Sequence, residues 1–134
     1  MSPSEARHEE LVERLSKVPF TDALDRITAS IEAAGMQVFA RIDHAAAASA
    51  VGLAMPPTTV LIYGNAKAGT PIMLETPAAA LDLPLRVLVR EDLHGRVCIA
   101  FHPVVALLKR SGVSEELAGH LVPAQRLLID AIRP

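Results

Sequence analysis

Two short polar clusters could carry chemistry in this chain, and both lie in an otherwise apolar stretch between residues 39 and 71. The first is the pair Asp43-His44. The second is the run of residues 64–70, which reads Gly-Asn-Ala-Lys-Ala-Gly-Thr. Polar side chains gathered between apolar segments serve either a turn or helix cap, or a binding site. Each cluster is therefore open to both interpretations.

Asp43 and His44 have the residue types of a general acid–base pair, in which the carboxylate fixes the tautomer of the histidine. Adjacent residues at the start of a helix point in different directions, however, so Asp43 would orient His44 poorly. An aspartate N-cap before an alanine-rich helix at residues 44–51, closed by Gly52, explains Asp43 on its own. The residues favour the cap and leave His44 as the candidate catalytic residue of an enzymatic alternative.

The two glycines of residues 64–70 have the separation found in a phosphate-binding loop. That loop needs a lysine directly after the second glycine and then Ser or Thr, whereas Lys67 lies between the glycines and Thr70 follows the second. What remains is a loop in which a small anion could meet Lys67, Asn65, Thr70 and backbone N–H groups. The alternative, which the residues alone favour, is that Gly64-Asn65 makes a turn, Thr70 caps the next helix and Lys67 is solvated.

The other reactive residues form no recognisable motif. The five histidines lack metal-ligand spacing, so we expect no metal site and no cofactor. Cys98 and His102 would lie about 13 Å apart on a strand, too far for the histidine to activate the thiol, and a buried structural cysteine is expected. Arg86 and Arg90 share one face of a strand, which indicates a solvated or interface face before an anion site.

Hydrophobic periodicity and capping residues around these clusters predict an α+β fold. Helical patterns cover residues 20–34, 44–51, 71–75, 77–81, 103–110, a turn capped by Ser114, and a last helix from Pro123. Strand patterns cover residues 36–42, 58–63, 85–91 and 96–101, the last two joined by a tight turn at 92–95. We therefore expect a two-layer sandwich in which helices pack on a four-stranded antiparallel or mixed sheet, with extra C-terminal helices. Residues 1–18 are expected to form a polar, partly helical arm, and residues 19–134 one domain with a helical extension from about residue 112.

Composition narrows the class of protein further. The chain has 134 residues, of which 51% are hydrophobic and 21% charged, enough for one domain with its own core. A net charge of −2 with 3% aromatic residues gives neither the charge nor the stacking platforms of a nucleic-acid binder. The single cysteine suits a reducing compartment, no apolar signal segment stands at the N-terminus, and every apolar run is far below the roughly 20 residues that span a bilayer. We expect a soluble, cytoplasmic protein without a nucleic-acid or membrane partner.

Several separated motifs resemble, in order, the bacterial and archaeal family catalogued as domain of unknown function 302. They are FARIDHAAA at residues 39–47, MPPT at 55–58, GNAKAGTP at 64–71 and ALDLPLRVLV at 80–89. The resemblance runs from residue 20 to about residue 101. It implies a compact α+β domain that forms dimers and has no established catalytic activity.

The resemblance also singles out polar positions. Those that recur in the family fall on Asp43, His44, Asn65, Lys67, Thr70 and Glu91-Asp92. Members often carry Trp near position 90 and again near position 98, with Tyr-Asn before the following helix. This chain has Arg90, Cys98 and Phe101-His102 there instead. If those aromatic residues line a pocket, the pocket of this member is more polar or serves another ligand.

The leading interpretation of the sequence is a homodimeric domain that binds a small anionic ligand, or a protein partner, at residues 64–70 beside Asp43-His44. Lys67 would supply charge, Asn65 and Thr70 hydrogen bonds, and His44 a titratable group. The alternatives are an enzyme that uses His44 as a general base, and a purely structural or regulatory interaction module. The candidate ligand-binding residues are Asp43, His44, Asn65, Lys67, Thr70 and Glu91.

Overall fold

The computed structural model of the chain describes residues 11–134, in which five strands form one antiparallel sheet in the order β1-β5-β4-β3-β2. The strands are β1 (Val12–Ser16), β2 (Gln37–Asp43), β3 (Thr58–Gly64), β4 (Leu85–Glu91) and β5 (Val97–Phe101). The helices are α2 (Phe20–Ala33), α3 (His44–Ala50), α4 (Ala66–Glu75), the 3-10 helix η1 (Pro77–Leu81), α5 (Val104–Lys109), α6 (Glu115–Gly119) and α7 (Val122–Ala131). The expected α+β sandwich is confirmed, with five strands in place of four.

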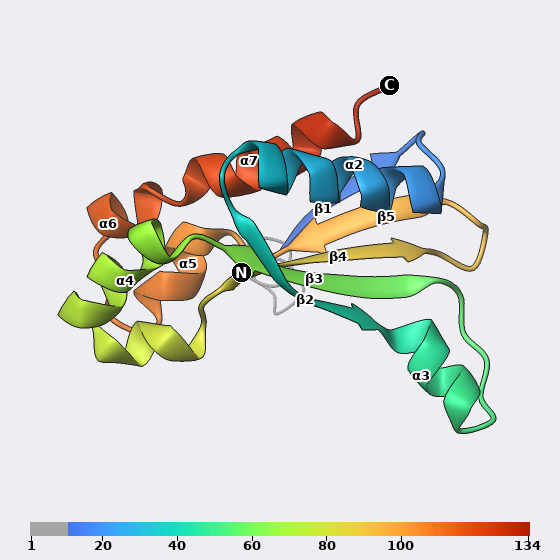
Figure 1. Cartoon of the computed structure of the whole chain (residues 1–134), viewed down its shortest axis with the longest axis horizontal. Coiled ribbons are helices and arrows are strands. Elements are labelled where there is room, and N and C mark those ends of the chain that lie inside the picture. The colour runs from blue at the N-terminus through green and yellow to red at the C-terminus, as the bar shows by residue number, and fades with distance from the viewer. Residues whose placement is uncertain (1–10) are drawn as a thin grey trace, which may run out of the picture.

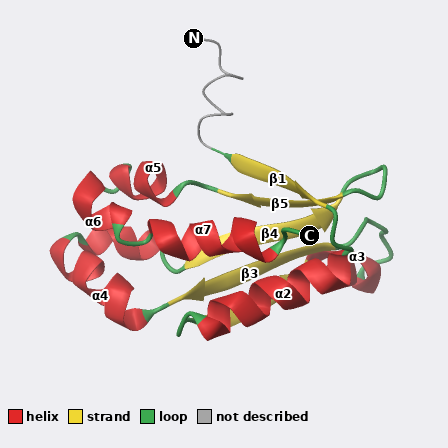
Figure 2. Ribbon diagram, turned by 90° about the horizontal axis from the view of Figure 1, so that it is seen from above, coloured by secondary structure: helices red, strands yellow, loops and turns green. Residues whose placement is uncertain are grey.

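Two helices, α2 and α7, cover one side of the sheet and lie side by side along it (Figures 1 and 2). Every second side chain of the central strands faces these helices, so Leu61 and Tyr63 on β3 and Val87 and Val89 on β4 are fully buried. The apolar positions of α2 that follow the 3.6-residue period, such as Ile27, are equally buried. The hydrophobic core therefore lies between the sheet and these two helices. Packing in this core also fixes the position of β3 and of both its ends.

The prediction of a helical arm is wrong for the described part of residues 1–18, because residues 12–16 form the edge strand β1. Val12 pairs with Phe101 and Ser16 with Val97, so β1 satisfies the backbone groups along the outer edge of β5. Leu11, Val12 and Leu15 match a helical face in sequence, but Val12 packs against the core whereas Leu15 is 65% exposed. The part of the arm at residues 1–10 lies outside the described residues.

The prediction of a loop at residues 64–70 is also wrong, because α4 begins at Ala66 and continues through Pro71 to Glu75. The Asn65 side chain caps the helix, and the Gly69 N–H donates to the Asn65 carbonyl oxygen at 2.9 Å. Pro71 has no N–H to offer the carbonyl of Lys67, so it removes only one intrahelical hydrogen bond. The Asn65 cap lies six residues before the first expected helical position, residue 71, and therefore starts the helix early.

The β4–β5 hairpin follows its prediction closely. One Asp92 carboxylate oxygen accepts hydrogen bonds from the backbone N–H groups of His94 and Arg96, and the other accepts from Arg96 Nε at 2.7 Å. The Arg96 backbone N–H, together with the other two donors, lowers the pKa of Asp92 to about 2. Gly95 adopts the positive φ of 76° that the turn requires.

Candidate functional site

The two polar clusters lie at opposite ends of β3, so the predicted site that combines them is not formed. Asp43 pairs with Thr59 near the start of β3, whereas Asn65 follows Gly64 at its end. At about 3.3 Å per residue, the strand separates the two positions by roughly 20 Å. Glu91 lies at the Asp43 end, where its backbone N–H donates to the Pro57 carbonyl oxygen at 3.0 Å.

At the first cluster, Asp43 is a helix cap, as the sequence favours. Its carboxylate accepts a hydrogen bond from the Ala46 backbone N–H at 2.8 Å, and both Asp43 and His44 are exposed. A carboxylate that faces the helix backbone does not orient the neighbouring imidazole. The geometry therefore gives no support to His44 as a general base.

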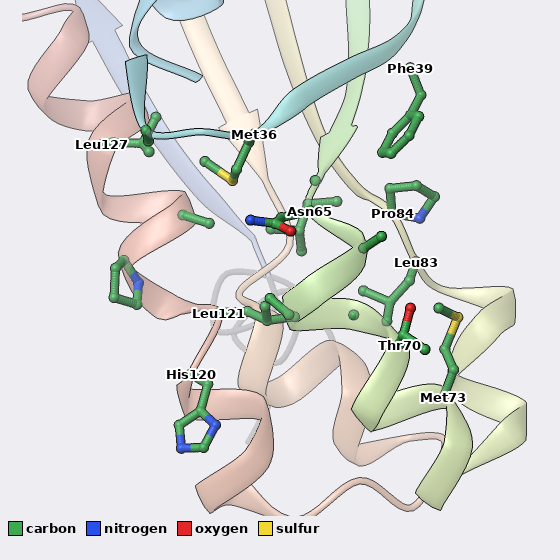
Figure 3. A pocket seen from close by; sticks show the side chains of 18 residues that line it. Met36, Phe39, Asn65, Thr70, Met73, Leu83, Pro84, His120, Leu121 and Leu127 are labelled. Atoms are coloured by element: carbon green, nitrogen blue, oxygen red, sulfur yellow. The ribbon is translucent and has the colours of Figure 1, made fainter. Parts of the chain in front are cut away.

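The second cluster borders a cavity of about 400 Å³ between the start of α4, the end of β3 and α7 (Figure 3). Most side chains that line the cavity are apolar: Ala34, Met36, Phe39, Ala66, Ala68, Met73, Leu83, Pro84, Leu85, Leu121, Pro123, Ala124 and Leu127. The polar side chains in the lining belong to Asn65, Thr70 and His120. An apolar hollow with a few polar groups at defined places is the usual form of a small-molecule site.

Asn65 is the best-defined polar group of this cavity. Its side-chain oxygen accepts a hydrogen bond from the Lys67 backbone N–H at 2.8 Å, which fixes the oxygen toward the helix. The amide nitrogen then points into the space between Met36 and α7 (Figure 3). The cavity is thus presented with a hydrogen-bond donor from a side chain whose orientation the α4 cap sets.

The other residues predicted for this cluster have different placements. Lys67 is exposed and does not line the cavity, in line with the alternative that it is solvated. Thr70 lines the cavity from inside α4. It does not cap a helix, because Asn65 already does so. Of the six candidate residues, the structure therefore brings only Asn65 and Thr70 to the cavity.

Two residues that sequence reasoning missed hold α7, the far wall of the cavity, in place. The buried Tyr63 hydroxyl donates to the Ala124 carbonyl oxygen at 2.8 Å, and burial raises the pKa of that hydroxyl well above its ordinary value. Gln125, 6% exposed, accepts from the Val104 N–H at 2.9 Å and donates to the His102 carbonyl oxygen at 2.8 Å. A glutamine on the apolar face of a predicted helix was the one available signal of such a role.

Within residues 11–134, no three His, Cys, Asp or Glu side chains come close enough together to hold a metal ion. Over that same range, none of the helices combines the length and the apolar character needed to cross a bilayer.

Among proteins of known sequence, the chain is similar to two named "Fluoride-specific ion channel FluC 1", from Brucella suis and Brucella abortus. Identity is 36% over 105 residues, which make up 77% of this chain but only 41% and 39% of those proteins. The chain thus spans about two fifths of the length of the curated relatives that it matches.

A solved structure and a family model agree on the fold and the family. The crystal structure of an uncharacterized conserved protein DUF302 from Bacillus stearothermophilus superposes with a TM-score of 0.83 at 16% identity. The superposition covers 92% of this chain and 98% of the other, which shows that the two share a fold. The family model described as domain of unknown function DUF302 matches residues 12–132, and the chain therefore belongs to this family.

Proposed function

We propose that this protein binds a small, mainly apolar molecule in the cavity between α4 and α7. The observation that carries the proposal is a cavity of about 400 Å³ with a largely apolar lining and one oriented amide donor, Asn65. Ligand sites typically enclose about 300–1,000 Å³ and bury most of a ligand against apolar side chains. A ligand of this kind would gain its affinity from burial and its orientation from Asn65.

The position of Asn65 restricts the chemistry of the ligand's polar end. Because the amide oxygen is engaged by the α4 backbone, the group left for a ligand is the amide nitrogen, which only donates. The matching ligand group is an acceptor, such as a carbonyl or a carboxylate. A carboxylate would also be stabilised by the positive end of the α4 dipole. The small anionic ligand expected from the sequence is therefore compatible with the proposed site.

The first test is a fluorescence titration with 1-anilinonaphthalene-8-sulfonate, a probe with apolar rings and an acceptor group. We expect saturable binding at one site per chain. Asn65→Asp should weaken it by about tenfold or more, because the helix cap is kept while the donor becomes a carboxylate that repels the sulfonate. Unfolding temperatures of both proteins report whether α4 remains capped.

The matched control is Asp43→Asn, which exchanges the same two side chains at the N-cap of α3, at the other end of β3. It should leave probe affinity unchanged. The proposal fails if Asn65→Asp binds the probe as tightly as the wild type, or if Asp43→Asn weakens binding equally.

The similarity to the channel proteins favours a second candidate function. We propose that the chain is a water-exposed accessory domain of a fluoride-handling protein, and that the conduction named for those relatives resides in the three fifths outside the match. Support comes from the 36% identity over 105 residues, together with described helices that are too short or too polar to cross a membrane. In fluoride-efflux assays, liposomes carrying this chain alone should release fluoride no faster than empty liposomes. Faster release would contradict the proposal.

The homodimer expected from the sequence stays a prediction, as does a cytoplasmic location.

A further inference from the structure

The cavity between α4 and α7 is lined from both sides of the end of β3. Side chains of consecutive residues on a strand point to opposite sides of the sheet. The Tyr63 hydroxyl reaches the Ala124 carbonyl oxygen on α7, so a side chain at the next and last residue of β3, Gly64, would face away from α7. The side of the cavity next to α7, called the α7 side below, is lined by Met36, Leu121, Ala124 and Leu127 (Figure 3).

A second group of apolar side chains lies on the other side of β3. A Cβ on Gly64 would lie 3.4 Å from Pro84 Cβ and 3.8 Å from Phe39 Cε2. A Cβ on Gly69, in α4, would lie within 4.0 Å of the other two side chains of this group. The group is called the Pro84 side below and consists of Phe39, Met73, Leu83 and Pro84. Figure 3 shows it away from α7, so one cavity has two apolar sides.

Asn65 stands where these two sides meet. It directly follows Gly64, and Figure 3 shows its amide between the α7 side and the Pro84 side. The Lys67 N–H holds the amide oxygen, so the donor left for a ligand is presented near the middle of the cavity and not at one end. A ligand that fills both sides must therefore pass Asn65 with its own chain. The acceptor that meets Asn65 then lies within the ligand and not at its tip.

The cavity offers no charged partner for an ion at this central position. Over residues 11–134, its lining contains no Asp, Glu, Lys or Arg, and the ionisable side chain that it does contain, His120, is exposed. Figure 3 shows His120 beyond Leu121, away from Asn65. Burying an ion without a partner is costly, and the dipole of α4 offsets only part of that cost. A neutral acceptor therefore fits the middle of the cavity better than a carboxylate does.

We infer, on the basis of the proposed function, that the ligand is a small neutral ester or amide with an apolar chain on each side of its carbonyl. The carbonyl oxygen accepts a hydrogen bond from the Asn65 amide nitrogen, while one chain lies on the α7 side and the other on the Pro84 side. A water molecule takes about 30 Å³ in the liquid, so a cavity of about 400 Å³ holds roughly a dozen non-hydrogen atoms. The ligand is thus far smaller than a membrane lipid.

Isothermal titration calorimetry with two isomeric amides tests the inference. N-butylhexanamide and decanamide contain the same atoms and both match the cavity in size, but the carbonyl lies inside the first and at the end of the second. We expect N-butylhexanamide to bind about fivefold more tightly or better. Decanamide must either give up the hydrogen bond to Asn65 or leave one side of the cavity empty.

Asn65→Ser should remove most of this preference, because serine is an equally good N-cap residue but has no amide nitrogen. The matched control is Asp43→Ser at the N-cap of α3, which should keep the full preference. Both variants should unfold cooperatively like the wild type. Equal binding of the two isomers by the wild type, or an undiminished preference in Asn65→Ser, would overturn the inference. Tighter binding of decanoate than of N-butylhexanamide would overturn it in favour of a carboxylate ligand.

Competition with 1-anilinonaphthalene-8-sulfonate distinguishes a failure of this inference from a failure of the proposed function. If both amides displace the dye with equal affinity, the cavity is a ligand site and only the ligand class is wrong. If neither amide binds, the inference fails. The proposed function fails with it only if Asn65→Asp also leaves binding of the dye unchanged.

Discussion

Replacing Gln125 by leucine is expected to lower the free energy of unfolding by about 3 kcal/mol, although the two side chains have similar volumes. The substitution removes the hydrogen bonds of Gln125 to the Val104 N–H and the His102 carbonyl oxygen, each worth about 1 kcal/mol. It also leaves the Val104 N–H, at the buried start of α5, without its acceptor, which costs a further 1–3 kcal/mol or so. The better burial of leucine offsets only part of this loss.

Thermal unfolding followed by circular dichroism measures the effect, which should be a fall of roughly 10 °C in Tm for a chain of this length. Arg126→Leu, at the exposed neighbouring position, is the control and should change Tm little. Since Gln125 holds α7 against the junction of β5 and α5, probe binding in the cavity should weaken together with stability. A Gln125→Leu chain that is as stable as the wild type would show that another group, such as water, satisfies the Val104 N–H.

Local sequence signals predicted those parts of the fold that local interactions determine. Residues 85–91 form the strand that their alternation of apolar and polar side chains predicts. Asp43 and Ser114 cap the helices expected of them, at 2.8 and 3.2 Å from the N–H groups they accept. Each of these outcomes depends on residues within a few positions of one another.

The edge strand β1 could not be predicted in this way, because its identity depends on a distant partner. Residues 12–16 pair with β5 about 85 positions later in the chain. Taken alone, the spacing of their apolar residues suits a helix. A strand is more favourable in the folded protein, because it pairs with the backbone N–H and C=O groups along the otherwise unpaired edge of β5. The cavity is similarly non-local, since it joins residues near position 65 to residues near position 124.

The separation of the two polar clusters follows from the relative direction of β2 and β3, which the sequence pattern left open. Asp43 ends β2, and Asn65 directly follows β3. The ends of two neighbouring antiparallel strands lie at opposite edges of the sheet, whereas the ends of parallel strands lie at the same edge. Either arrangement was compatible with the antiparallel or mixed sheet expected from the pattern, and only the antiparallel pairing of β2 with β3 decides the matter.

Gly69→Leu is expected to remove probe binding from the cavity without harming the fold. Gly69 lies inside α4, and a Cβ there would approach Met73 Cε at 3.8 Å and Leu83 Cδ1 at 4.0 Å, both ordinary contacts with side chains of the cavity wall. A leucine would extend past these atoms into the cavity, so we expect the affinity for 1-anilinonaphthalene-8-sulfonate to fall by about tenfold or more. The same titration that tests Asn65→Asp measures the loss.

Gly69→Ala is the control that distinguishes loss of probe binding through filling of the cavity from loss through a change in α4. Alanine and leucine both favour a helix interior over glycine, so Gly69→Ala should raise the free energy of unfolding by about 0.5–1 kcal/mol. Leucine should give the same gain, reduced by any crowding against Met73 and Leu83. Only the leucine variant should lose the probe, because alanine leaves most of the cavity open.

If both variants bind like the wild type, the probe lies elsewhere and the cavity between α4 and α7 is not the ligand site. Equal loss in both would assign the effect to the helix, because the alanine methyl group fills too little space to exclude the probe.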